Sequence, residues 1–144
     1  MKKALYLDDL RTPTTTIPGY EPWYVVRNYE EFVNWITENG IPDLISFDHD
    51  LAQEHINDYF KQFMDFGHQI PNYSEYKEKT GLDCAKWLSK HIQDNNLILK
   101  LVSVHSANPV GASNIQSYIN GFKKHMGWAQ DCFIAVHNFV VEEK

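Results

Sequence analysis

The sequence predicts an α/β protein, a single three-layer domain built on a five-stranded parallel sheet in flavodoxin-like order. Three observations lead to this prediction. Short apolar runs without polar alternation, which are typical of strands buried on both faces, recur along the chain. Segments with helical spacing of apolar residues separate most of these runs, as right-handed crossovers between parallel strands require. The 144 residues suffice for one sizeable core, and we expect residues 1–144 to form one domain.

The first half of the chain contains three of the expected strands. They are residues 4–7, 23–26 and 44–47. Residues 10–22 carry several prolines and threonines without a helical period, so we expect an irregular first crossover. Asn28, with Glu31 three residues later, forms a variant of the capping box and predicts a helix that ends at Gly40.

The second half of the chain should complete the sheet. Thr80 and Asp83 begin another capped helix, and Pro109 stands at the first position of a third amphipathic helix. The two remaining strands are residues 99–104 and 132–136. Residues 52–79 show little regularity and are predicted to be an insertion after the third strand, either a lid over the site or a surface helix that covers the sheet edge.

Composition excludes several classes of protein. Thirteen basic against nineteen acidic residues give a net charge of -6, which disfavours nonspecific nucleic-acid binding through phosphate contacts. Cys84 and Cys132 lie far apart without CxxC spacing, so neither a disulfide framework nor a zinc knuckle is indicated. The N-terminus leads directly into a short strand, and no apolar run approaches membrane-spanning length. We therefore expect a cytoplasmic protein with no membrane partner.

Acidic side chains follow two of the predicted strands at their carboxyl ends, where ligands gather in parallel sheets. Asp8 and Asp9 follow the first strand, and Asp48 follows the third. Converging carboxylates repel one another unless a cation lies between them, and their oxygens suit a hard divalent ion. Asp8, Asp9 and Asp48 are therefore predicted to bind Mg²⁺ or Mn²⁺. The alternative is that Asp8, Asp9 and Asp50 only cap turns.

Two histidines occupy comparable positions. His49 and His105 follow the third and fourth strands, which are neighbours in a flavodoxin-like sheet, so both should emerge at the same edge. Imidazole titrates near neutral pH, and we expect these two residues to act as general acid and base, unless they are structural. Arg11 is expected to neutralise charge that develops in the reaction. Asp50 either orients one histidine or satisfies backbone amides.

The helix that Pro109 begins predicts a phosphate site, because the amides of a helix N-terminus attract anions. The expected phosphate-binding residues are Ser106, Asn108, Gly111 and Ala112. Ser106 and Asn108 suit a helix cap equally well, and for Asn108 the cap is the first interpretation.

Several segments resemble the cyclic-phosphate processing receiver domain family, which derives from the receiver domains of two-component signalling. They are LDDLRTP at 7–13, Trp23 with Val25 and Arg27, SFDHDL at 46–51, GLD at 81–83 and HSANP at 105–109. The resemblance implies a receiver-like fold and action on cyclic phosphates at RNA ends. It also makes Asp48, the position of the receiver phosphoacceptor, an alternative nucleophile. Unlike receivers, the chain has an irregular first crossover and, at 136–138, no lysine after the fifth strand.

Together these features predict a hydrolase, a metal-dependent phosphoesterase that acts on cyclic or terminal phosphates of a small molecule, a nucleotide or an RNA end. Its predicted catalytic residues are His49, His105, Asp48 and Arg11. Two alternatives remain: a receiver-like module switched by phosphorylation of Asp48, or a noncatalytic metal- or phosphate-binding module, for example an accessory protein of a mobile element. The absent lysine disfavours the first. The two histidines disfavour the second, because simple cation binding does not need them.

Overall fold

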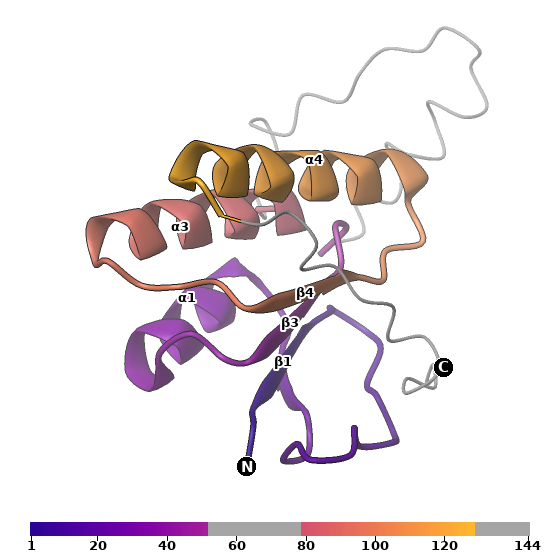
Figure 1. Cartoon of the computed structure of the whole chain (residues 1–144). Helices are drawn as coiled ribbons and strands as arrows, with labels where there is room; N and C mark the ends of the chain where they lie inside the picture. Colours follow the sequence, from indigo (N-terminus) through magenta and orange to yellow (C-terminus); the bar gives the residue numbers. More distant parts are fainter. Residues whose placement is uncertain (52–78, 129–144) are drawn as a thin grey trace, which may run out of the picture.

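A parallel sheet with three helices packed on it forms the described part of the chain, residues 1–51 and 79–128 of a computed structural model (Figure 1). The strands are β1 (Ala4–Leu7), β2 (Tyr24–Val26), β3 (Leu44–Phe47) and β4 (Leu101–Val104). The helices are α1 (Tyr29–Asn39), α3 (Gly81–Asp94) and α4 (Pro109–Met126). The expected fifth strand at 132–136 and residues 52–78 of the expected insertion lie outside the described residues.

The four strands are all parallel and follow the order β2-β1-β3-β4. This is the flavodoxin-like order that the sequence predicts for these strands. The register joins Tyr6 to Ser46 across β1 and β3, and Ser46 to Ser103 across β3 and β4. Every residue of β1 and β3 is buried, as expected for the central strands of a sheet covered on both faces.

All three described helices cover the same face of the sheet (Figure 1). The chain passes from β1 to β2 in one direction and then returns across the sheet to β3 and β4. Because each crossover is right-handed, the first connection falls on one face and the later ones on the other. Ile17 and Tyr20 of the first connection pack against Ala4 and Leu44. In this part of the molecule the second covering layer is therefore an irregular segment without a helix.

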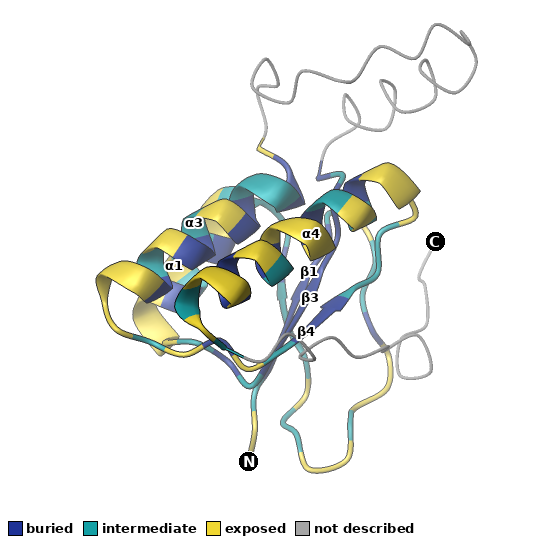
Figure 2. Cartoon of the chain, turned by 45° about the horizontal axis from the view of Figure 1, so that its top comes forward, coloured by how far each residue is buried: buried dark blue, intermediate teal, exposed yellow. Residues whose placement is uncertain are grey.

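The main core lies between the sheet and the helices. Phe32 of α1 packs against Phe47 of β3 and against Trp87 of α3, with ring centroids 5.7 and 6.2 Å apart. Figure 2 shows the helices burying the faces turned toward the sheet and exposing the opposite ones. None of the described helices is long and apolar enough to cross a membrane.

The helix ends follow the predicted signals. The side chain of Asn28 accepts from the N–H of Glu31 at the start of α1, and Gly40 ends this helix with a φ of 85° that favours glycine. Thr80 and Asp83 form a complete capping box at the start of α3. These caps fix where each helix begins relative to the ends of the strands.

Helix α3 begins against the backbone that follows β3. The N–H of Gly81 donates to the carbonyl oxygen of His49 at 2.8 Å. A Cβ atom at Gly81 would overlap the carbonyl oxygen of Asp48, so only glycine allows this approach. The start of α3 thereby holds the segment that carries the predicted site residues.

Candidate active site

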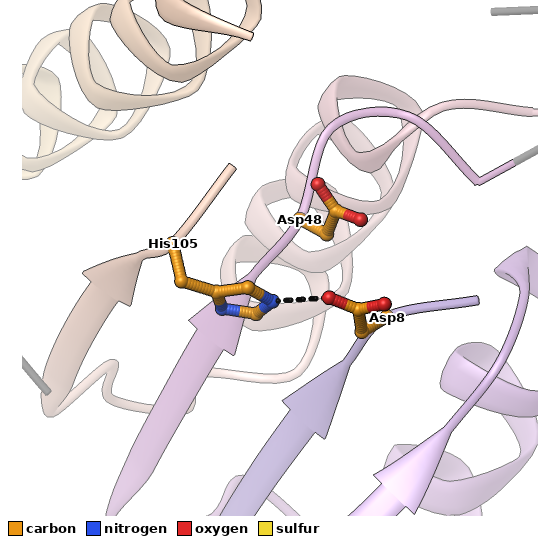
Figure 3. Close-up of side chains that lie close together, drawn as sticks. All are labelled: Asp8, Asp48 and His105. Atoms are coloured by element: carbon orange, nitrogen blue, oxygen red, sulfur yellow. Dashed lines mark hydrogen bonds and ion pairs between the residues drawn. The ribbon is translucent and has the colours of Figure 1, made fainter. Parts of the chain in front are cut away.

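Three polar side chains converge at the carboxyl ends of β1, β3 and β4 (Figure 3): Asp8, Asp48 and His105. The register row formed by Tyr6, Ser46 and Ser103 explains this convergence. Each of the three polar residues lies two positions after a member of that row. Side chains two positions apart along a strand share one face, so the three emerge at one level on one face. One ligand atom from each lies within 4.8 Å of the others.

The Asp8 carboxylate is bound on both oxygens. Oδ1 accepts from the backbone N–H groups of Leu10 and Arg11 at 2.9 and 2.7 Å. Oδ2 accepts from Arg11 Nε at 2.7 Å and lies 3.0 Å from His105 Nε2. Burial alone would raise the pKa of Asp8, but these hydrogen bonds and the Arg11 charge lower it to about 2. Asp8 is therefore a carboxylate at neutral pH.

Asp48 has the opposite electrostatic environment. Its Oδ1 accepts from the N–H of His49 at 2.8 Å, and Arg11 Nη2 lies 3.7 Å from the same oxygen. Burial and the nearby negative charge of Asp8 raise the pKa of Asp48 to about 8, and the Arg11 charge offsets only part of this. One of two adjacent acids thus holds its proton near neutral pH. A divalent cation between them would favour the charged form of both.

The His105 ring extends from the end of β4, past β3, toward the end of β1. Its Nδ1 lies 2.6 Å from Ser46 Oγ, and the ring stacks on Tyr6 with centroids 4.1 Å apart and planes inclined by 6°. Burial lowers the pKa of His105, and its hydrogen bond to Asp8 opposes this effect only in part. The ring is therefore a neutral imidazole held on three sides.

Arginine side chains organise the loop after β1. Arg11 Nη2 donates to the carbonyl oxygen of His105 at 3.1 Å. Arg27 Nη1 donates to the carbonyl oxygens of Asp8 and Arg11 at 3.1 and 2.8 Å, and its Nη2 donates to Thr12 Oγ1 at 2.6 Å. The list of site residues predicted from the sequence omits Arg27, although the resemblance includes it. A charged residue directly after β2, beside the end of β1, was the available signal.

His49 does not join His105. It lies three positions after Ser46, one more than Asp48, so it has the opposite orientation. Its side chain is fully buried, and a Cβ atom at Gly111 of α4 would overlap its ring. Its Nδ1 lies 2.8 Å from Asp50 Oδ1. The expectation that both histidines face one phosphate is therefore not met, and the acid–base role of His49 stays a prediction that its burial disfavours.

The predicted phosphate-binding residues form the cap of α4. Asn108 Oδ1 accepts from the N–H of Gly111 at 3.1 Å, and its carbonyl oxygen accepts from the N–H of Ala112 at 2.9 Å. Ser106 Oγ accepts from the N–H of Asn108 at 3.1 Å. Asn108 Nδ2 donates to Asp50 Oδ1 at 3.3 Å. The amides of Gly111 and Ala112 are engaged within the helix, so phosphate binding by these four residues stays a prediction and the geometry favours the cap.

The potential ligand set differs from the predicted one. The grouping among the described residues contains His105 in place of Asp9, beside Asp8 and Asp48. Asp9 lies one position beyond Asp8, in the bend that follows β1, and is not part of this grouping. The three residues offer two oxygens and one nitrogen, a donor set that suits a divalent cation.

Comparison with known proteins gives this site a family context. The model of the cyclic-phosphate processing receiver domain matches residues 3–121. The chain belongs to this family. No curated protein matches the sequence. The matched range contains all the described strands and the site residues named above, so the receiver-like fold and the three converging side chains belong to one cyclic-phosphate processing receiver domain.

Proposed function

We propose that this cyclic-phosphate processing receiver domain is a metal-dependent phosphoesterase that hydrolyses a cyclic or terminal phosphate of a nucleotide or an RNA end. The observation that carries the proposal is the convergence of Asp8, Asp48 and His105 beside the guanidinium of Arg11. Two carboxylates and a neutral imidazole are suited to a cation, and a guanidinium is suited to a phosphate. The family description supports a phosphate-related substrate.

The cation would be held by Asp8, Asp48 and His105. Two features of the chain support this fit: the pKa of Asp48, which burial and the charge of Asp8 raise, and the buried imidazole of His105, whose ligand nitrogen lies within 4.8 Å of an oxygen of each carboxyl group. A nitrogen ligand shifts the preference from Mg²⁺ toward Mn²⁺, because Mg²⁺ strongly prefers oxygen. When bound, such an ion polarises a phosphoryl oxygen and orients a water molecule.

Arg11 supplies the positive charge from the protein itself. Its side chain is 18% exposed and contacts Asp8 and Asp48, so it lies between the acidic pair and the surface. Arginine remains charged at all relevant pH values and can donate two parallel hydrogen bonds to a phosphate. We assign it the neutralisation of the charge that develops on the phosphoryl oxygens.

The acid–base roles follow from burial. Because His105 Nε2 lies 3.0 Å from the Asp8 carboxylate, we assign His105 as a metal ligand. We assign His49 a structural role: through Asp50 and Gly111 it positions the residues directly after β3 against the start of α4. In this proposal the proton for the leaving hydroxyl comes from water. If His105→Gln binds the cation as wild type does but loses turnover, His105 is a proton carrier, as the sequence predicts.

The test is turnover of cyclic and linear nucleotide phosphates by the purified chain with Mn²⁺, Mg²⁺ or a chelator. We expect hydrolysis only with a cation, and a loss of about a hundredfold or more in Asp48→Asn. Asp94→Asn is the matched control, because that carboxylate is exposed and pairs with Lys90 across one helical turn. Turnover that persists in the chelator would refute the proposal that hydrolysis depends on a metal ion. Stable labelling of Asp48 by a small phosphodonor, without turnover, would favour the regulatory alternative.

A further inference from the structure

The hydrogen bond between Ser46 and His105 connects the middle of β3 to the site. Ser46 is fully buried, and its Oγ lies 2.6 Å from Nδ1 of the imidazole. Its neighbour in the register, Ser103, is almost as buried and faces the same side of the sheet. We propose that Ser46 is a positioning residue that holds Nδ1 of His105 in either tautomer, and that its hydroxyl changes from hydrogen-bond donor to acceptor when His105 binds a cation.

Without a cation, Asp8 dictates the tautomer. A carboxylate only accepts hydrogen bonds, and Oδ2 of Asp8 already accepts from Arg11 Nε. The 3.0 Å contact with His105 therefore requires a hydrogen on Nε2. A neutral imidazole carries one hydrogen, so Nδ1 presents a lone pair. The hydroxyl of Ser46 is then the donor in the 2.6 Å contact.

With a cation bound, the roles reverse. This step rests on the proposed function, in which Nε2 becomes a ligand through its own lone pair. Nε2 then releases its proton to water and Nδ1 takes up one from water, so the imidazole stays neutral. Ser46 keeps its hydroxyl proton, turns it away and accepts from Nδ1–H instead. A hydroxyl serves both states because it is donor and acceptor and its hydrogen rotates freely.

The ring itself has little freedom to adapt. Tyr6 stacks on one side at a centroid distance of 4.1 Å, and Arg11 binds the carbonyl oxygen of the same residue at 3.1 Å. A ring turned over would place carbon atoms opposite Asp8 and Ser46. Because the ring cannot turn, rotation of the Ser46 hydroxyl accommodates the change between the two tautomers of His105.

Nitrogen-15 NMR of the full-length chain tests this assignment. In metal-free wild type we expect the hydrogen on Nε2 of His105 and a hydrogen-bonded lone pair on Nδ1. Diamagnetic Zn²⁺, used as a probe, should move the hydrogen to Nδ1. In metal-free Ser46→Ala, the Nδ1 resonance should move downfield because the lone pair loses its donor. Ser103→Ala is the matched control and should leave this resonance in place, whereas Ser46→Thr keeps the hydroxyl and should restore it.

Cation affinity provides the second readout. Loss of the partner of a metal-binding histidine typically weakens binding about 10- to 100-fold, and we expect this loss for Zn²⁺ in Ser46→Ala but not in Ser103→Ala. Equal affinity in the two variants would overturn the proposal, as would a hydrogen on Nδ1 in metal-free wild type. If wild type binds no cation but shows the metal-free pattern above, the proposed function fails and the assignment of Ser46 as the donor to His105 stands.

Discussion

Asp8 and Asp48 follow neighbouring strands and lie close together, but they differ in protonation near neutral pH: Asp8 is ionised, and Asp48 holds its proton. Asp8 receives hydrogen bonds on both oxygens and stays ionised, whereas Asp48 receives one from the adjacent backbone and faces the charge of Asp8. The difference between their pKa values arises because burial and the charge of Asp8 dominate at Asp48, whereas hydrogen bonds and the Arg11 charge outweigh burial at Asp8. It predicts how the stability of the metal-free protein depends on pH.

We predict that Asp48→Asn stabilises the metal-free protein at pH 8 and has little effect near pH 4. The pKa of Asp48 is raised from 3.8 to about 8 in the folded chain, so its contribution to stability is complete below pH 3.8 and is lost as pH rises through 8. Asparagine stays neutral and avoids this loss. Denaturant unfolding in a chelator should show a gain of about 1–3 kcal/mol at pH 8. An equal gain at pH 4 and pH 8 would show that the stabilisation does not come from the ionisation of Asp48.

Arg27 gives a second prediction at the scale of single residues. Its planar guanidinium binds three acceptors in the loop after β1, and a lysine ammonium cannot reproduce that fork. We expect Arg27→Lys to cost about 1–2 kcal/mol of unfolding free energy. Lys90→Gln is the control, since its exposed ion pair with Asp94 should contribute less than about 1 kcal/mol. Thermal unfolding of both variants would measure the difference, and equal losses would argue against this role.

At the scale of elements, the N-termini of two helices press against the segment after β3. Gly81 of α3 contacts the backbone of Asp48, and Gly111 of α4 contacts the ring of His49. The helices thereby position the site by close packing. Glycine is required at both points because a larger side chain would occupy space that the segment fills.

Gly81→Ala tests this packing. Its Cβ would overlap the backbone carbonyl of Asp48, so the backbone would have to shift, and we expect a loss of about 2–4 kcal/mol in unfolding free energy. Gly121→Ala is the matched control within α4, because in the described part of the chain no atom outside the neighbouring backbone of α4 lies within 4 Å of a Cβ built there. There alanine should stabilise by about 0.5–1 kcal/mol. If thermal unfolding ranks the two variants in the opposite order, the contact at Gly81 does not restrain the site.

The four described strands, the three described helices and the order of these strands could be predicted from the sequence, because caps and apolar runs are local signals. The convergence of Asp8 with Asp48 could also be predicted from neighbouring strand ends. The pairing of His49 with His105 could not, because it required the orientation of each side chain, and that depends on counting positions from a register row such as Tyr6, Ser46 and Ser103. The engagement of the α4 amides by Asn108 could not be decided either, because a cap and a phosphate site share one pattern.

At the scale of the whole molecule, cation binding should stabilise the folded chain, since the three side chains converge only when β1, β3 and β4 are assembled. At about 100 times the dissociation constant, a ligand specific for the folded state adds about 2.7 kcal/mol. We predict a rise of several degrees in melting temperature with Mn²⁺ and a smaller one with Mg²⁺ at the same concentration. Scanning calorimetry of wild type and of the double variant Asp8→Asn, Asp48→Asn would decide. An equal rise in both proteins would place the ion elsewhere.

The register row of Tyr6, Ser46 and Ser103 also determines which changes the site tolerates. The three groups that follow it take their positions from the hydrogen-bonded ladder between strands, and the lengths of the connections do not enter. Insertions in parts of the connections that do not contact these groups should therefore leave the cluster unchanged, whereas a slip of one residue in β3 would turn Asp48 toward the helices and remove it from the cluster. Under the proposed function, exchanging loops should therefore alter substrate preference, while the backbone pairing keeps Asp8, Asp48 and His105 in place.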